Sequence, residues 1–218
     1  KGKEYVFKFI KKGGKLVKTR HMGVNFVPLV SEKKKILKLA ELPKNFSGKV
    51  GERNLNELFM YFNIGTQKCN LFNSLKNQIS SETLSSFSSV PREMFMPFQY
   101  IEKTYNDRPH PIGYNQTISQ PSLVCKMIDY LKLKPNDNVL EVGTGYGYNA
   151  ALLSKISKHV VTLDIVLELV EGAREVYNFL IKKGILSNNL LVLHGDGYRG
   201  YKERGPYDKV IVTCGATG

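Results

Sequence analysis

Three acidic residues, Glu141, Asp164 and Asp196, each stand at or next to the end of a short apolar run in the second half of the chain. If these runs are parallel strands, their carboxyl ends meet at one edge of a sheet and bring the carboxylates together. Asp164 lies about twenty residues after a glycine-rich turn, where a carboxylate accepts hydrogen bonds from ribose hydroxyls and repels a 2′-phosphate. Asp196 could accept a hydrogen bond from an adenine amino group. Each acid alone could also be a simple turn-former.

The glycine-rich turn follows the first of these runs. Residues Asn138–Ala151 read NVLEVGTGYGYNAA, with Gly143, Gly145 and Gly147 at alternate positions. A strand, a glycine turn and a helix present backbone N–H groups to a ligand, and glycine permits positive φ and a close backbone approach. The spacing is not the G-x-G-x-x-G of dinucleotide sites, and the G-K-[ST] of a triphosphate loop is absent. The turn therefore predicts a nucleotide site without a triphosphate.

A second polar set lies upstream, in the run QTISQP at residues 116–121. Pro121 suits the first turn of a helix that we expect from about Ser122 to Leu133. Ser119 or Gln120 would then lie at the start of this helix, with their polar groups near the ligand of the glycine turn. A helix cap without further function is the alternative.

The elements that must position these residues form an α/β pattern. We expect strands at 139–142, 160–164, 190–193 and 209–213, with helices at 148–157 and 167–183. Strands alternating with helices predict a doubly wound, Rossmann-like, mostly parallel sheet whose ligands bind at the carboxyl ends of the strands.

The first hundred residues precede this pattern. Residues 1–30 predict an antiparallel hairpin that turns at Gly13-Gly14, and residues 31–53 a linker that contains the lysine triplet 33–35. Residues 54–100 predict amphipathic helices with a break near Gly65 and a cap at Ser80 or Ser81. The apolar cluster at 94–98 should pack in the core. We thus expect one domain: the hairpin 1–30 at the sheet edge, the linker 31–53, and a helical cap with the ligand-binding core at 54–218.

Composition limits the classes of function. The chain has 218 residues, 42% hydrophobic, and a net charge of +13, which indicates either an acidic partner or a solvated, lysine-rich surface. Three separated cysteines without metal-ligand spacing favour a reducing, cytoplasmic compartment and no metal site. Neither a signal peptide nor a membrane-spanning run is apparent.

Several of these segments resemble one family. Residues 141–147, EVGTGYG, resemble motif I of class I S-adenosylmethionine-dependent methyltransferases. Residues 108–121, RPHPIGYNQTISQP, resemble the signature of protein-L-isoaspartate O-methyltransferases, and VPREMF at 90–95, HGDG at 194–197 and PYDKVIVT at 206–213 fit as well. The resemblance runs from about residue 71 to the C-terminus.

This resemblance implies methyl transfer from S-adenosylmethionine to the α-carboxylate of L-isoaspartyl residues in damaged proteins or peptides, with S-adenosylhomocysteine as product. Ser119 would hydrogen-bond the accepting carboxylate, and Thr117 would shape that site. The implied cofactor residues are Glu141, Gly143, Thr144, Gly145 and Gly147 for the methionine part, Asp164 for the ribose, Asp196 and Gly197 for the adenine, and Gln120. The family often has Glu in place of Asp164. A cytoplasmic monomer without membrane or nucleic-acid partners is expected.

Two alternatives stay open: a peptide-tailoring enzyme that methylates ordinary aspartate, and a non-catalytic module that binds S-adenosylmethionine or RNA. The segment order also departs from the family, because residues 1–30 resemble its last two strands. A circular permutation, an altered recorded order or a fragment of two tandem copies would explain this.

Overall fold

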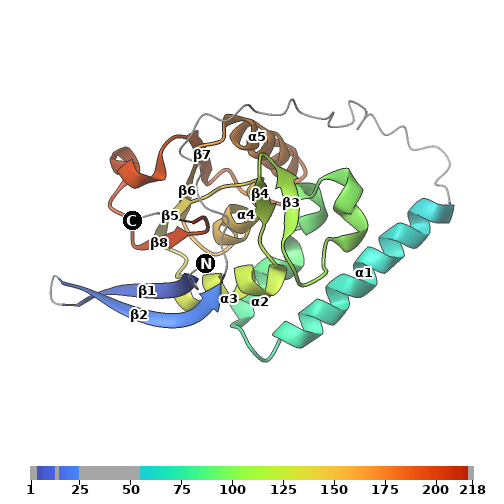
Figure 1. The fold of residues 1–218 in the computed structure, drawn as a ribbon, viewed down its shortest axis with the longest axis horizontal. Helices are drawn as coiled ribbons and strands as arrows, with labels where there is room; N and C mark the ends of the chain where they lie inside the picture. The colour runs from blue at the N-terminus through green and yellow to red at the C-terminus, as the bar shows by residue number, and fades with distance from the viewer. Residues whose placement is uncertain (1–3, 13–14, 25–54, 216–218) are drawn as a thin grey trace.

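A four-stranded parallel sheet carries the predicted ligand edge (Figure 1). It consists of β5 (Asn138–Val142), β6 (His159–Asp164), β7 (Leu190–His194) and β8 (Lys209–Val212) in the order β7-β6-β5-β8. The computed structural model describes the backbone of residues 4–12, 15–24 and 55–215 and the side chains of residues 63–215. All ladders between these strands are parallel, which confirms the predicted Rossmann-like core.

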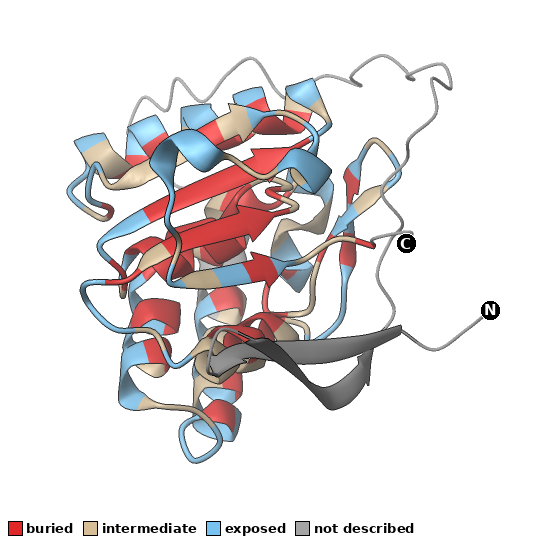
Figure 2. Cartoon of the chain, turned by 90° about the vertical axis from the view of Figure 1, so that its left-hand side faces the viewer, coloured by how far each residue is buried: buried red, intermediate tan, exposed pale blue. Residues whose placement is uncertain are grey.

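Three helices cover one face of this sheet. They are α3 (Pro121–Leu131), α4 (Tyr148–Ser154) and α5 (Leu167–Lys182). Their apolar side chains form the main core together with one side chain from each strand, namely Val139, Val160, Val192 and Ile211. The buried central strands, coloured red in Figure 2, need apolar residues on both faces, which explains their continuous aliphatic runs.

The other face of the sheet has a thinner cover. Leu140, Val161 and Leu163 form a small cluster there, against which Tyr201 and Tyr207 pack. These tyrosines belong to the segment that contains η3 (Gly197–Arg199) and η4 (Lys202–Arg204), which crosses in front of the sheet in Figure 2.

The predicted helical region is α1 (Leu55–Leu75), α2 (Ser81–Ser89) and the short helices η1 (Arg92–Phe95) and η2 (Phe98–Lys103). The predicted break near Gly65 is wrong, because α1 runs through this residue. A glycine inside a helix costs only about 1 kcal/mol relative to alanine, and the helix buries Ile64, Leu71 and Leu75 in a second core cluster. Phe98, expected in the core, is 65% exposed.

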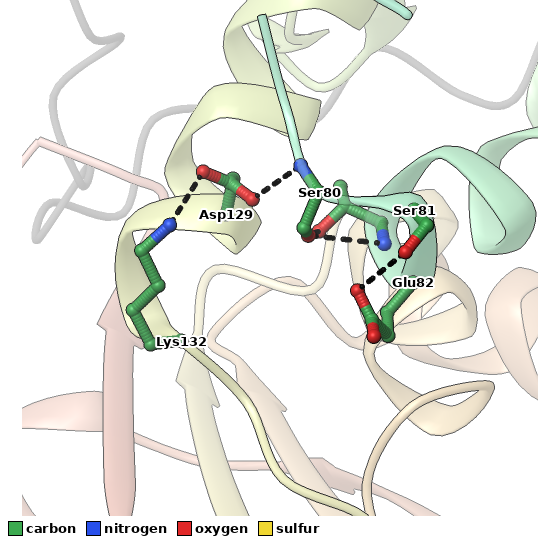
Figure 3. A network of polar contacts seen from close by, with 6 residues as sticks. Ser80, Ser81, Glu82, Asp129 and Lys132 are labelled. Carbon is green, nitrogen blue, oxygen red and sulfur yellow. Dashed lines mark hydrogen bonds and ion pairs between the residues drawn. The ribbon is translucent and has the colours of Figure 1, made fainter.

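The start of α2 is tied to the end of α3 (Figure 3). Ser80 caps α2, as predicted, by accepting a hydrogen bond from the Thr83 N–H. The Ser80 N–H in turn donates to Asp129 Oδ1 at 2.8 Å, and Lys132 Nζ lies 3.0 Å from Asp129 Oδ2. The helical region is therefore joined directly to the helix that begins at the polar run QTISQP.

The N-terminal hairpin consists of β1 (Glu4–Lys12) and β2 (Lys15–Val24), which pair antiparallel as predicted. The two strands form a sheet of their own and are not hydrogen-bonded to the four-stranded sheet, which differs from the predicted position at its edge. Instead, β1 lies beside α3. The turn at 13–14 and the linker 31–53 lie outside the described residues, and the division into hairpin, linker and core stays a prediction.

Candidate active site

A cavity of about 580 Å³ opens where β5, β6 and β8 end, at the edge that the parallel sheet predicts. Its volume is in the range of small-molecule sites. It brings together residues that are distant in the sequence, among them Thr117, Ser119, Gln120, Gly143, Asp164 and Thr213. The predicted acceptor loop and the predicted nucleotide turn therefore line the same cavity.

The glycine turn is held by the neighbouring strands. The N–H groups of Gly143 and Thr144 donate to the Leu163 carbonyl at 2.8 and 3.2 Å. Gly143 has a φ of +102°, and a Cβ at this position would lie 2.8 Å from Thr213 Oγ1. Glycine is required here both by the backbone conformation and by the close packing against the end of β8.

Asp164 lies at the cavity wall and orders the loops around it. Its Oδ2 accepts a hydrogen bond from the Gly145 N–H at 2.8 Å, and its Oδ1 accepts one from the Val166 N–H at 3.0 Å. Burial raises the pKa of this carboxyl, and the backbone hydrogen bonds oppose that shift. Each carboxylate oxygen keeps a further lone pair, so the side chain can still accept hydrogen bonds from a ligand.

Glu141 is placed differently from Asp164. It is 0% exposed, and it does not line the cavity. Thr162 Oγ1 donates to one of its oxygens at 2.6 Å and Asn149 Nδ2 to the other at 2.5 Å. Burial raises the pKa of Glu141 to about 7. Its predicted direct contact with the ligand stays a prediction, and the structure shows it supporting the turn from behind.

Thr162 also supports the glycine turn, and the sequence did not identify it as a functional residue. Its hydroxyl lies 2.7 Å from Thr144 Oγ1, so that Thr144, Thr162 and Glu141 form a continuous hydrogen-bonded chain under the turn. The available signal was a threonine in the middle of an otherwise aliphatic buried strand. A polar group in that position requires a partner.

The acceptor loop is built on a hairpin of β3 (His110–Gly113) and β4 (Gln116–Ile118). Its two turn residues, Tyr114 and Asn115, have φ values of +53° and +56°. Positive φ at both positions is the backbone of the tight hairpin turns, and it is unusual for tyrosine. This turn directs β4 and the following Ser119 toward the glycine turn.

The polar residues after β4 do not cap α3. Gln120 occupies the N-cap position, but its side chain makes no capping hydrogen bond. Asp107 Oδ1 accepts the Ser122 N–H at 2.9 Å instead. The predicted place of Gln120 at the start of the helix is therefore confirmed, whereas the alternative of a side-chain cap is not. Within residues 63–215 the Ser119 hydroxyl has no protein hydrogen-bond partner, so it is available to a ligand.

Asp196 and Gly197 lie outside the cavity wall. Asp196 is exposed and caps η3 by accepting the Tyr198 N–H at 3.0 Å, so it does act as a turn-former. A Cβ on Gly197 would collide with Val142 Cγ1, which shows how closely this segment packs on β5. Their predicted contact with an adenine ring stays a prediction.

Two observations concern the wider chain. Within the residues that the structure describes, no cluster of His, Cys, Asp or Glu side chains could hold a metal ion. Among the described helices, none has the length and apolar character that a membrane crossing requires.

Comparisons with known proteins agree on one family. A family model described as protein-L-isoaspartate(D-aspartate) O-methyltransferase matches residues 66–218. A protein-L-isoaspartate O-methyltransferase of Fervidobacterium nodosum is 43% identical over 139 residues, which cover 62% of this chain and 67% of the relative. One of Ignicoccus hospitalis is 44% identical over 138 residues, which cover 62% and 63%. The chain thus spans about two thirds of the length of these curated relatives.

The fold agrees with solved structures. A protein-L-isoaspartate O-methyltransferase structure matches with a TM-score of 0.56 and 32% identity, over 67% of this chain and 47% of the other. A Plasmodium falciparum structure, described as a candidate enzyme of the same name in complex with S-adenosyl-L-homocysteine, matches with a TM-score of 0.53. It is 24% identical, and the match covers 66% and 71% of the two chains, so it supports the fold alone. From the matched family model and the relatives, this chain belongs to the protein-L-isoaspartate(D-aspartate) O-methyltransferase family.

Proposed function

We propose that this chain transfers a methyl group from S-adenosylmethionine to the α-carboxylate of L-isoaspartyl residues in damaged proteins and peptides. The observation that carries the proposal is the shared cavity, in which the acceptor loop with Ser119 faces the glycine turn and Asp164. Family membership supplies the reaction type, and the cavity supplies one site in which a nucleotide-type cofactor and a polar acceptor can meet.

The residues present fit a cofactor of this kind. The turn at Gly143 permits close approach of a ligand to the backbone, and Asp164 keeps acceptor capacity for ribose hydroxyls. One cavity-lining side chain, Asn149, has a buried polar atom without a protein partner, its Oδ1. Unsatisfied buried groups of this kind require a partner such as a ligand or a water molecule. Gln120, from the acceptor side, completes the polar lining.

The proposed reaction does not require the protein to act as a general base. S-adenosylmethionine supplies an electrophilic methyl group on a positively charged sulfur. An acceptor carboxylate is already ionised at neutral pH, so no side chain has to remove a proton from it. The protein must orient the acceptor and exclude water, since placement of reacting groups and desolvation reduce the barrier. The Ser119 hydroxyl would donate a hydrogen bond to one acceptor oxygen, and the exposed Thr117 would border the acceptor.

The decisive experiment compares two peptides that differ only in one linkage. Methyl transfer from labelled S-adenosylmethionine should occur to an isoaspartyl peptide and not to the matched aspartyl peptide. Ser119→Ala should reduce transfer, because it removes the hydrogen bond to the acceptor, while S-adenosylhomocysteine binding is retained. Transfer to the aspartyl peptide alone would replace this function with the tailoring of ordinary aspartate, and cofactor binding without any transfer would favour a non-catalytic module.

Partners and location follow from the same proposal. The substrates would be isoaspartyl-containing proteins or peptides, without a nucleic-acid or membrane partner. The three cysteines, of which Cys125 is buried, are all unpaired, which supports a reducing cytoplasmic compartment. A monomer is proposed, and size-exclusion chromatography with light scattering tests it.

A further inference from the structure

Arg92 is a fully buried arginine that stands behind the cavity and is not one of its lining residues. It opens η1, directly after Pro91, within the VPREMF run. An arginine keeps its positive charge in proteins even when buried. Burial of such a charge is costly unless hydrogen bonds and counter-charges compensate for it. The arrangement around Arg92 therefore needs an explanation.

The guanidinium joins two segments of the cavity wall. Its Nη2 donates to the Ser119 carbonyl at 2.7 Å, and its Nε donates to the Thr104 carbonyl at 2.8 Å. Its central carbon lies 4.8 Å from the centre of the Tyr148 ring, the first residue of α4. Ser119 and Tyr148 both line the cavity, from the acceptor loop and from the cofactor turn respectively. Arg92 thus contacts both sides of the site from within the protein.

No carboxylate neutralises this charge at short range. Within residues 63–215, the only ion pair joins Lys132 to Asp129. Asp107 is the carboxylate that attracts Arg92 over a longer distance, and it already accepts the Ser122 N–H. The third guanidinium nitrogen, Nη1, is buried without a partner. An anionic group placed at the cavity wall would therefore approach a positive charge that has no carboxylate partner at short range, in a medium that screens it poorly.

We propose that Arg92 is a positioning residue of the acceptor site, which holds the Ser119 carbonyl in place and favours an anionic acceptor through its unpaired charge. The inference rests on the proposed function and deepens it, because it assigns the preference for a carboxylate acceptor to a residue that does not touch that acceptor. Arginine suits this role, since one planar group serves two carbonyls and stacks on an aromatic ring at once.

Equilibrium binding tests the proposal without requiring turnover. A fluorescent isoaspartyl peptide is titrated into the protein saturated with S-adenosylhomocysteine, and the affinity for S-adenosylhomocysteine is measured separately. Arg92→Gln should weaken peptide binding by 10-fold or more, with S-adenosylhomocysteine affinity within 3-fold of the original. Arg92→Lys keeps the charge but cannot donate to both carbonyls. Its peptide affinity should therefore lie between that of the original protein and that of Arg92→Gln. If Arg92→Gln does not fold, the peptide affinity of Arg92→Lys is compared directly with that of the original protein, and it should be weaker.

Arg174→Gln is the matched control, because Arg174 also donates through Nε and Nη2 to a carbonyl, that of Val192, but away from the cavity. It should leave peptide binding unchanged. Unchanged peptide affinity in Arg92→Gln, or an equal loss for peptide and S-adenosylhomocysteine, would overturn the proposal. Absence of isoaspartyl peptide binding by the original chain would instead refute the proposed function.

Discussion

Substitution of Asp164 by asparagine should separate cofactor affinity from stability. An amide has one acceptor oxygen, so it can no longer accept both the Gly145 and the Val166 N–H groups and still bind a ribose hydroxyl. The loss of one hydrogen bond to a charged group costs about 1.5–3 kcal/mol, which corresponds to a 10- to 150-fold weaker affinity for S-adenosylhomocysteine. Without ligand, the change should cost about 1 kcal/mol or less, because removal of a buried charge offsets the lost backbone hydrogen bond.

Isothermal titration calorimetry with S-adenosylhomocysteine measures the affinity, and urea denaturation of the ligand-free protein measures the free energy of unfolding. Asp129→Asn is the control, since Asp129 also accepts a backbone N–H, from Ser80, but lies away from the cavity. It should reduce stability and leave the affinity unchanged. An affinity of Asp164→Asn within 3-fold of the original would show that Asp164 only orders the protein loops.

Two further substitutions test the support of the turn. The pKa of Glu141 rises from about 4.5 to about 7 on folding, so its contribution to stability is complete below pH 4.5 and is lost as the pH rises through 7, about 3 kcal/mol in all. In urea denaturation series, Glu141→Gln should therefore gain stability relative to the original protein as the pH rises from 4.5 to 8. A difference in unfolding free energy between the two proteins that stays constant over this pH range would contradict the assigned burial. Gly147→Ala should destabilise by about 2–4 kcal/mol, because alanine is strained at its φ of +94° and its Cβ would overlap the Tyr177 hydroxyl. Gly184→Ala, at a φ of +70° with open space around it, should cost about 1–2 kcal/mol, and equal losses at the two positions would refute the overlap.

Local pattern was sufficient for the sheet and most of the helices. The aliphatic runs around Leu140, Val161 and Val192 predicted strands because a buried parallel strand requires apolar side chains on both faces. The break in α1 was predicted wrongly, since the preference of Gly65 against helix is weaker than the burial of the residues around it. Phe98 was misplaced because its hydrophobic character does not show whether a neighbouring segment covers it.

The sequence predicted the positions of some site residues correctly and of others not. Asp164 and Ser119 lie at the cavity wall as expected, because the end of a strand and the start of a helix have defined positions in a parallel α/β fold. Glu141 is acidic like Asp164 and also stands near the end of a strand, yet it is buried beneath the turn. Period-two alternation along β5 places Glu141 on the same face of the sheet as Val139, which the helices cover, and only the partners Thr162 and Asn149 reveal its role.

The sequence by itself therefore determined the α/β class, the glycine turn and the family, because these depend on residue types at short, regular spacings. Tertiary structure decided which polar groups meet. The contact between Arg92 and the Ser119 carbonyl spans 27 residues, and that between Asp164 and Gly145 spans 19. Such pairs are set by strand order and by packing of the core, and neither can be read from local periodicity.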